Sequence, residues 1–156
     1  MRQNSRRSFL ALISALFVAP LFTVNAQGLV AFDRSALSIK TAKGRFKLNI
    51  EMAISRRQQS QGLMFRRSLA ADAGMLFDYR IPQRISMWMK NTFIPLDMIF
   101  IDQDGKVINI AERTIPRSEV VFSSKTPARA VLEVNGGTAS RLGIRPGDQV
   151  LHAVFK

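Results

Sequence analysis

The 156-residue sequence contains no cysteine and a single histidine, His152. Without cysteine the chain can form no disulfide, no thiolate nucleophile and no cysteine-ligated metal site. With one histidine it cannot form a site with two histidine ligands, and a Ser/His/Asp triad would have to use His152. No serine lies in a recognisable nucleophile motif, so we predict no triad, no metal site and no cofactor.

Acidic residues are also scarce, with 11 Asp and Glu against 23 Lys and Arg. Three of the basic residues, Arg2, Arg6 and Arg7, lie in the leader described next, which leaves 20 basic and 11 acidic residues and a net charge of +9. The positive electrostatic field of such a protein attracts anionic partners, including lipid headgroups, lipopolysaccharide and wall polymers. The basic residues are scattered and not interleaved with aromatic side chains, so we expect no nucleic-acid binding.

The N-terminus has the three parts of a bacterial signal peptide. Residues 1–8 are polar and basic, residues 9–24 are uncharged and apolar, and Val24-Asn25-Ala26 offers small side chains to a signal peptidase. We predict cleavage after Ala26 and a single β-rich domain at residues 27–156. The apolar run is shorter than the roughly 20 residues of a spanning helix, so no permanent membrane span is expected after cleavage.

The segment Ser5-Arg6-Arg7-Ser8-Phe9-Leu10 resembles the twin-arginine export signal, Ser/Thr-Arg-Arg-x-Phe-Leu, at every defined position. The resemblance implies export of an already folded protein. A general secretory signal with two arginines is the alternative. Both routes predict a periplasmic or otherwise exported protein.

Hydrophobic periodicity predicts mostly short strands. Alternation over residues 37–40 and 46–52 predicts a hairpin with one buried face. A capping box at Ser55-Arg56-Arg57-Gln58 predicts a short helix that ends at Gly62. Further strands are predicted at 75–77, 85–89, 98–101, 106–112, 129–135 and 149–155, with a turn at Pro82 and a second helix at 139–142. The fold class is therefore mainly β (α+β): one compact, largely antiparallel sandwich or barrel with one or two short helices.

The only tryptophan, Trp88, stands beside Lys90 and Asn91. An aromatic ring next to hydrogen-bonding groups is typical of sites for sugars or other small polar ligands, because the ring stacks on apolar faces while polar groups bind hydroxyls. A core tryptophan at a strand end followed by a polar turn is the alternative.

Three carboxylates occupy unusual places in the strand pattern. Glu112 continues the apolar face of the predicted strand 106–112, and Asp97 precedes a wholly apolar strand. Glu133 is ambiguous, because it alternates against its neighbours but shares a face with Val131. A carboxylate in apolar surroundings is either paired with a cation or kept for function.

For Asp97 we predict an ion pair, with Arg66 or Lys90 as the partner. A pocket lined jointly by Arg66, Trp88 and Asp97 would support a ligand site. If the three side chains lie in separate places, the binding-site and hydrolase hypotheses fail together.

Five motifs occur in order along the chain: Gly62-Leu63-Met64-Phe65-Arg66, Gly74-Met75-Leu76-Phe77, Trp88-Met89-Lys90-Asn91-Thr92, Pro95-Leu96-Asp97 and Val131-Leu132-Glu133. Together they resemble domain-of-unknown-function family 192, a group of small prokaryotic proteins, many of them exported. The resemblance covers roughly residues 38–155 and implies a compact, jelly-roll-like β domain with no established reaction. The motif residues without a packing explanation are Arg66, Trp88, Lys90, Asn91 and Asp97, and more weakly Glu112 and Glu133.

Three functions follow from these residues. The first is a periplasmic module that binds a small polar or saccharide-like ligand through Trp88, Lys90, Asn91 and Asp97. The second is a hydrolase of a glycan-like polymer that uses Asp97 with Glu112 or Glu133 as an acid/base pair. The third is an envelope interaction protein that uses its basic surface. The sequence leaves open whether the protein is an enzyme.

Overall fold

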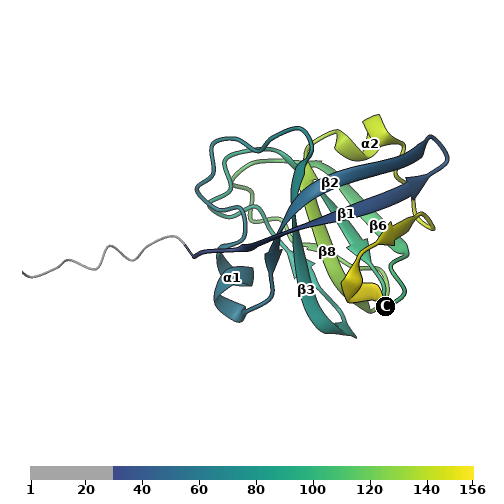
Figure 1. The fold of residues 1–156 in the computed structure, drawn as a ribbon. Coiled ribbons are helices and arrows are strands. Elements are labelled where there is room, and N and C mark those ends of the chain that lie inside the picture. Colours follow the sequence, from purple (N-terminus) through teal and green to yellow (C-terminus); the bar gives the residue numbers. More distant parts are fainter. Residues whose placement is uncertain (1–29) are drawn as a thin grey trace, which may run out of the picture.

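The computed structural model of the chain describes residues 30–156. The predicted signal peptide and its cleavage site at Ala26 lie outside the described residues. The described part forms one seven-stranded sheet, a second sheet of two very short strands, and two short α-helices (Figure 1).

The large sheet has the strand order β6-β5-β8-β3-β2-β1-β9. Its strands are β1 (Asp33–Thr41), β2 (Gly44–Ala53), β3 (Ala73–Gln83), β5 (Leu96–Ile101), β6 (Val107–Thr114), β8 (Ala128–Asn135) and β9 (Gln149–Leu151). All neighbours are antiparallel except β2 and β3, which run parallel. The two-stranded sheet pairs β4 (Ser86–Met87) with β7 (Phe122–Ser123).

The large sheet curls until its two edge strands meet at one end. The backbone amide of Val107, at the start of β6, donates to the carbonyl of Asp148 at 2.9 Å, and the amide of Val150 in β9 donates to Gly105 at 2.8 Å. The fold is therefore a half-barrel of mainly antiparallel strands with two short helices. This confirms the predicted fold class, and the barrel is the better description of the two alternatives.

Two hydrophobic cores pack on the two faces of the central strands. One is aliphatic and includes Leu37, Ile39, Leu48, Ile50, Leu76, Ile99, Leu132 and Val134. The other, here called the Met–Phe core, includes Met75, Phe77, Met89, Met98, Phe100 and Val131. Because side chains alternate along a strand, successive residues of β8 enter opposite cores.

The predicted hairpin and both predicted helices are confirmed. Helix α1 (Arg56–Gln61) begins at Ser55, whose side chain accepts from the amide of Gln58 in a complete capping box, and ends at Gly62. Helix α2 (Thr138–Leu142) ends at Gly143, which adopts the left-handed conformation that glycine favours. Figure 1 shows the two helices far apart on the molecule.

Three element predictions are wrong in extent. Strand β3 continues through Pro82, where a turn was predicted, because its pairing with β8 is interrupted between Asp78 and Gln83 and so needs no amide at the proline. The predicted strand 85–89 is reduced to the two residues of β4. The last predicted strand ends at Leu151, and a 3-10 helix (Ala153–Phe155) follows it.

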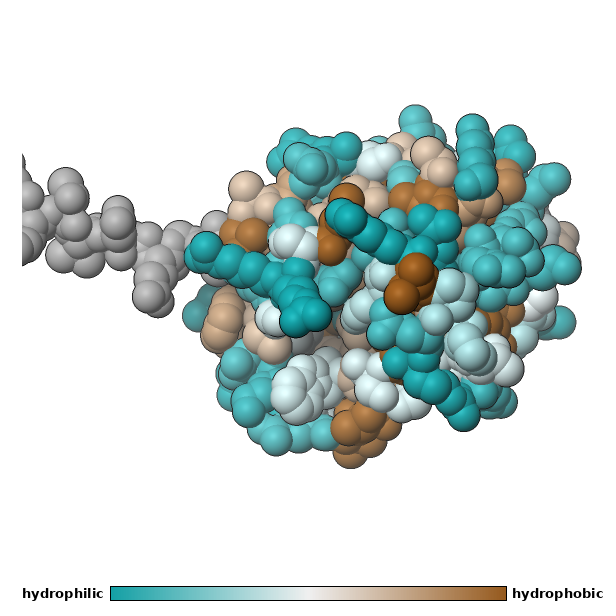
Figure 2. All heavy atoms as spheres, turned by 90° about the horizontal axis from the view of Figure 1, so that it is seen from below, coloured by the Kyte–Doolittle hydropathy of each residue, from teal (hydrophilic) through white to brown (hydrophobic). Residues whose placement is uncertain are grey.

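The surface is largely hydrophilic. On the face drawn in Figure 2, hydrophobic residues lie in separate small groups among hydrophilic ones. The large hydrophobic side chains that are exposed within residues 30–156 are Phe65, Ile81, Trp88, Ile115, Val120 and Val121.

Candidate functional site

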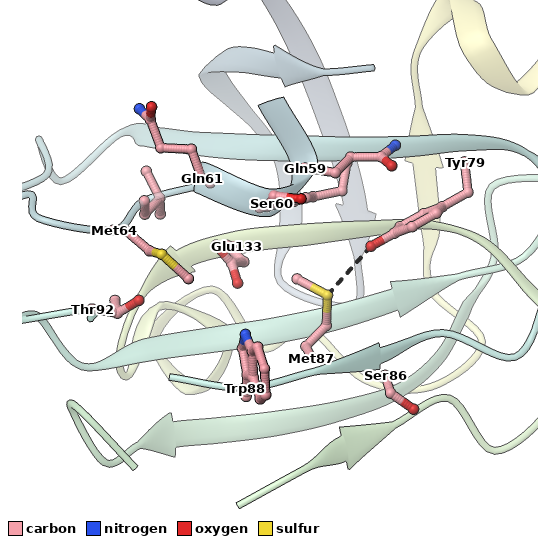
Figure 3. A pocket seen from close by; sticks show the side chains of 13 residues that line it. Gln59, Ser60, Gln61, Met64, Tyr79, Ser86, Met87, Trp88, Thr92 and Glu133 are labelled. Atoms are coloured by element: carbon pink, nitrogen blue, oxygen red, sulfur yellow. Dashed lines mark hydrogen bonds between the residues drawn. The ribbon is translucent and has the colours of Figure 1, made fainter. Parts of the chain in front are cut away.

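A pocket of about 180 Å³ lies between helix α1 and the residues that follow it, strand β3, and the segment from β4 to Thr92. Its lining residues are Gln59, Ser60, Gln61, Gly62, Leu63, Met64, Phe77, Tyr79, Ser86, Met87, Trp88, Thr92 and Glu133. Figure 3 shows the Glu133 carboxyl in the middle of the labelled side chains, with Met64 and Met87 on either side and Trp88 below it. We call this the Glu133 pocket.

The strand register places Glu133 beneath the pocket. Strand β8 lies between β3 and β5, and Glu133 is paired with Met75 on one side and Met98 on the other. Both methionines belong to the Met–Phe core, so the carboxyl enters apolar surroundings in the interior of the sheet. The residue is only 4% exposed.

The Glu133 carboxyl has no hydrogen-bond or ion-pair partner within residues 30–156. In the same part of the chain, every side-chain nitrogen or oxygen that is completely enclosed has a hydrogen-bond partner. The Glu133 oxygens must therefore open onto the pocket. Burial raises the pKa of this carboxyl to about 8, because the charged form loses its hydration without gaining a partner.

Tyr79 is the other titratable group in the pocket. Its pKa is raised to about 12, first by burial and second by the negative charge of Glu133. The phenol is therefore neutral at any physiological pH. Its hydroxyl donates a weak hydrogen bond to the sulfur of Met87 at 3.6 Å (Figure 3).

Trp88 lies at the mouth of the pocket and is 49% exposed. It also lines a neighbouring depression with Ser86, Met87 and Val121. The ammonium group of Lys90 lies 5.5 Å from the centre of the Trp88 ring and 3.6 Å from a carboxylate oxygen of Glu119. This exposure favours a platform over a core tryptophan, because a core ring would be enclosed.

Local backbone geometry shapes the wall opposite Trp88. Gly62 has a φ of +46°, and a Cβ there would lie 2.8 Å from the Phe77 ring, so a glycine lets the chain pack tightly on β3. Asn91 has a φ of +56° within a turn, and its carbonyl accepts from the amide of Phe65 at 2.9 Å. Asn91 thus joins the two sides of the pocket through its backbone, and its side chain is not among the lining residues.

Asp97 lies elsewhere and the prediction of a cationic partner for it is wrong. Its carboxylate accepts three backbone amides, from Arg113 at 2.7 Å, Gly137 at 2.9 Å and Ala139 at 2.8 Å. The residue is 0% exposed, and its partner in the register is Val134, which belongs to the aliphatic core. Asp97 thus stabilises the start of α2 and the end of β6, on the opposite face from Glu133.

The other predicted residues are also separate from the pocket. Arg66 forms an ion pair with Glu51, and its guanidinium lies 5.7 Å from the Phe32 ring centre. Glu112 is exposed, contrary to the predicted apolar face, because the pairing of β6 with β5 shifts register near this residue. Of the seven predicted residues, only Trp88 and Glu133 line the Glu133 pocket. Arg66, Trp88 and Asp97 lie in separate places, so the ligand site and the hydrolase site built on Trp88 and Asp97 both fail as predicted.

Sequence reasoning missed most of the pocket wall. Gln59, Gln61 and Met64 come from the short helix and the turn after it, and Tyr79 comes from the irregular half of β3. The available signal was the Gly62-Leu63-Met64 motif, which brings the helix end against β3. Within residues 30–156 no three His, Cys, Asp or Glu residues lie close enough together to hold a metal ion.

Comparison with known proteins supports a family but no activity. The model of the family described as "DUF192: Uncharacterized ACR, COG1430" matches residues 38–152, which is most of the chain. The chain belongs to the DUF192 family. A search of curated proteins finds no match for this DUF192 protein.

Two solved structures are similar to this DUF192 protein at high sequence identity. One, from Sinorhizobium meliloti 1021, is described as a candidate transcription regulator. It is 44% identical with a TM-score of 0.78, and the match covers 81% of this chain and 99% of that one. The other, a protein of unknown function from Novosphingobium aromaticivorans DSM 12444, is 41% identical with a TM-score of 0.75, and the match covers 76% of this chain and 85% of that one.

Among residues 30–156 there is no helix with the length and apolar character needed to cross a membrane.

Proposed function

We propose that this protein is an exported binding module whose Glu133 pocket takes a small polar, saccharide-like ligand. The observation that carries the proposal is a buried carboxyl, Glu133, that has no partner among residues 30–156 and shares its pocket with a half-exposed aromatic ring, Trp88. A buried polar group without a partner lowers stability, so a ligand that supplies the missing hydrogen bonds is a physical reason for keeping one.

The size and lining of the pocket support a small ligand. Pockets for drug-sized molecules have volumes of about 300–1,000 Å³, whereas this one has about 180 Å³. It therefore suits one ring or one functional group. The lining offers a carboxyl at Glu133, hydroxyls at Ser60 and Thr92, and the Trp88 face for stacking.

The lining disfavours the hydrolase alternative. A glycosidase of the usual kind needs two carboxyl groups on either side of the scissile bond, and Glu133 is the only carboxyl among the lining residues. Asp97 is enclosed on the other face of the sheet with its oxygens occupied. The binding module needs only the one carboxyl.

Export rests on the sequence of the leader. We expect periplasmic protein to begin at Gln27, which N-terminal sequencing would establish. Replacing both Arg6 and Arg7 with lysine keeps the positive charge, so a general secretory signal tolerates the change while a twin-arginine signal does not. Unimpaired export of the double variant would contradict the twin-arginine route.

A second candidate function rests on charge. Three of the 20 basic residues after the leader form ion pairs within residues 30–156, and the large remainder gives a basic surface suited to an anionic envelope polymer or lipid. Binding to anionic vesicles that falls steeply with salt would support it.

The regulator name of one relative does not extend to DNA binding here, because the described helices have six and five residues and neither forms a helix-turn-helix.

The direct test of the binding module uses the fluorescence of Trp88, the only tryptophan. We expect red-shifted, quenchable emission from the exported protein, and a change in emission on addition of monosaccharides or wall fragments. Blue-shifted emission that no quencher reaches would place the ring inside a core and overturn Trp88 as a ligand contact.

A further inference from the structure

The Glu133 pocket contains one acidic group and no basic group. None of its 13 lining residues is Lys, Arg or His, although the protein as a whole is strongly basic. Arg66 and Lys90, which belong to the motifs around the pocket, form ion pairs with Glu51 and Glu119, and the Lys90 ammonium lies 5.5 Å from the centre of the Trp88 ring. The protein therefore supplies no counter-ion for Glu133 from the pocket wall.

The neighbours of the carboxyl also suit a cation. Trp88 and Tyr79 contribute aromatic rings, and Met64 and Met87 contribute polarisable thioethers (Figure 3). Aromatic rings attract cations, most strongly where water is excluded. The Tyr79 hydroxyl donates to the sulfur of Met87, and burial with no hydrogen bond from residues 30–156 accounts for the raised pKa of the Glu133 carboxyl.

We propose that the group received by this pocket is an ammonium group, so that the ligand is a small organic amine such as an amino sugar. The proposal rests on the proposed function and narrows its ligand class. The ammonium supplies both the positive charge and the hydrogen-bond donors that Glu133 lacks, while the remainder of a sugar ring stacks on Trp88.

The balance of protonation favours this pairing over a neutral hydroxyl. With a pKa of about 8, Glu133 is mostly neutral at pH 7, and ionising it costs about tenfold in affinity. An ammonium has three donors and can donate to both carboxylate oxygens, and each such charged hydrogen bond returns roughly ten- to a hundredfold, against roughly two- to tenfold for one from a neutral hydroxyl. The ammonium complex is therefore favoured, and its formation releases a proton from Glu133.

The experiment compares three sugars of the same ring: glucosamine, glucose and N-acetylglucosamine. Binding to the exported protein is measured at pH 6.5 by Trp88 fluorescence and by calorimetry in two buffers with different heats of ionisation. We expect glucosamine to bind roughly tenfold more tightly than the other two, because ionising Glu133 at this pH costs about thirtyfold of what the ammonium returns. We also expect close to one proton to be released per glucosamine bound, because Glu133 is almost fully protonated at that pH.

The variant Glu133→Gln keeps the shape of the side chain and removes its charge. We expect it to lose the preference for glucosamine and the proton release, while glucose binding changes little. Glu112→Gln, at an exposed carboxylate outside the pocket, is the matched control and should keep both.

Two results would overturn the inference, at different levels. If all three sugars bind equally, or if Glu133→Gln keeps the preference for glucosamine, the ammonium group is not what the pocket receives, and the binding function remains. If none of the sugars, nor wall fragments, changes Trp88 emission or gives heat, the proposed function itself is contradicted.

Discussion

Asp97 and Glu133 are both buried carboxylates on neighbouring strands, and they differ in what surrounds their oxygens. Asp97 enters the aliphatic core and meets three backbone amides at the start of α2 and the end of β6. Glu133 enters the Met–Phe core, meets no donor from residues 30–156, and opens onto a pocket. Asp97 lies opposite Val134, which directly follows Glu133 in β8. Because successive residues of a strand face opposite sides of the sheet, the two carboxylates enter different cores, and only that of Glu133 is a candidate for function.

The comparison teaches that burial alone does not mark a site. Both residues are at most 4% exposed. A carboxylate whose oxygens are occupied by amides stabilises the fold, because removing it leaves those amides unsatisfied. A carboxylate without partners weakens the fold wherever it is ionised, and this cost is what a ligand can recover.

The largest expected effect is that of Asp97→Asn on stability. The substitution removes the charge and turns the side-chain NH2 group of asparagine toward a backbone N–H that needs an acceptor. We expect a loss of roughly 3–5 kcal/mol in the free energy of unfolding, measured by urea denaturation. Glu112→Gln is the control and should change it by less than about 0.5 kcal/mol. A variant as stable as the wild type would mean that the three amides have other acceptors.

The next effect is the pH dependence contributed by Glu133. The folded-state pKa is raised from 4.5 to about 8, so the folded state holds a proton that the unfolded state releases. This contribution to stability is full below pH 4.5 and is lost as the pH rises through 8. Between pH 4 and 7 the loss amounts to about 3 kcal/mol.

Glu133→Gln should remove that loss, because glutamine does not titrate. The variant should be more stable than the wild type at pH 7 and equal to it near pH 4, in parallel urea denaturations. The other titratable group lining the pocket, Tyr79, stays neutral over this range and adds nothing. A constant difference between the two proteins across the range would contradict an unpaired, buried Glu133.

The smallest effect is that of Trp88→Ala on stability. A half-exposed ring leaves no closed cavity, so we expect a loss well below the roughly 3–5 kcal/mol of a core tryptophan. Ligand binding should disappear in the same variant. A loss of stability as large as that of a core tryptophan would show that the ring is packed more tightly than its exposure indicates.

The sequence alone predicts the fold class and the two short helices, because hydrophobic periodicity and the capping box at Ser55 are local signals. It identifies Asp97 as unusual but assigns it the wrong partners, because the amides that bind it come from residues 16 to 42 positions away. Such partners are fixed by strand register, which local patterns do not specify. Glu133 remains ambiguous for the same reason.

The most direct test of the account is the titration of the Glu133 side chain in the free protein and with glucosamine. Carbon NMR of the carboxyl, assigned with Glu133→Gln, follows its ionisation in each state. The account predicts a pKa near 8 in the free protein, raised by burial, and a clearly lower pKa in the complex, because the ammonium stabilises the charged form. A free-state pKa near the ordinary 4.5, unchanged by glucosamine, would contradict both the unpaired carboxyl and its role in binding.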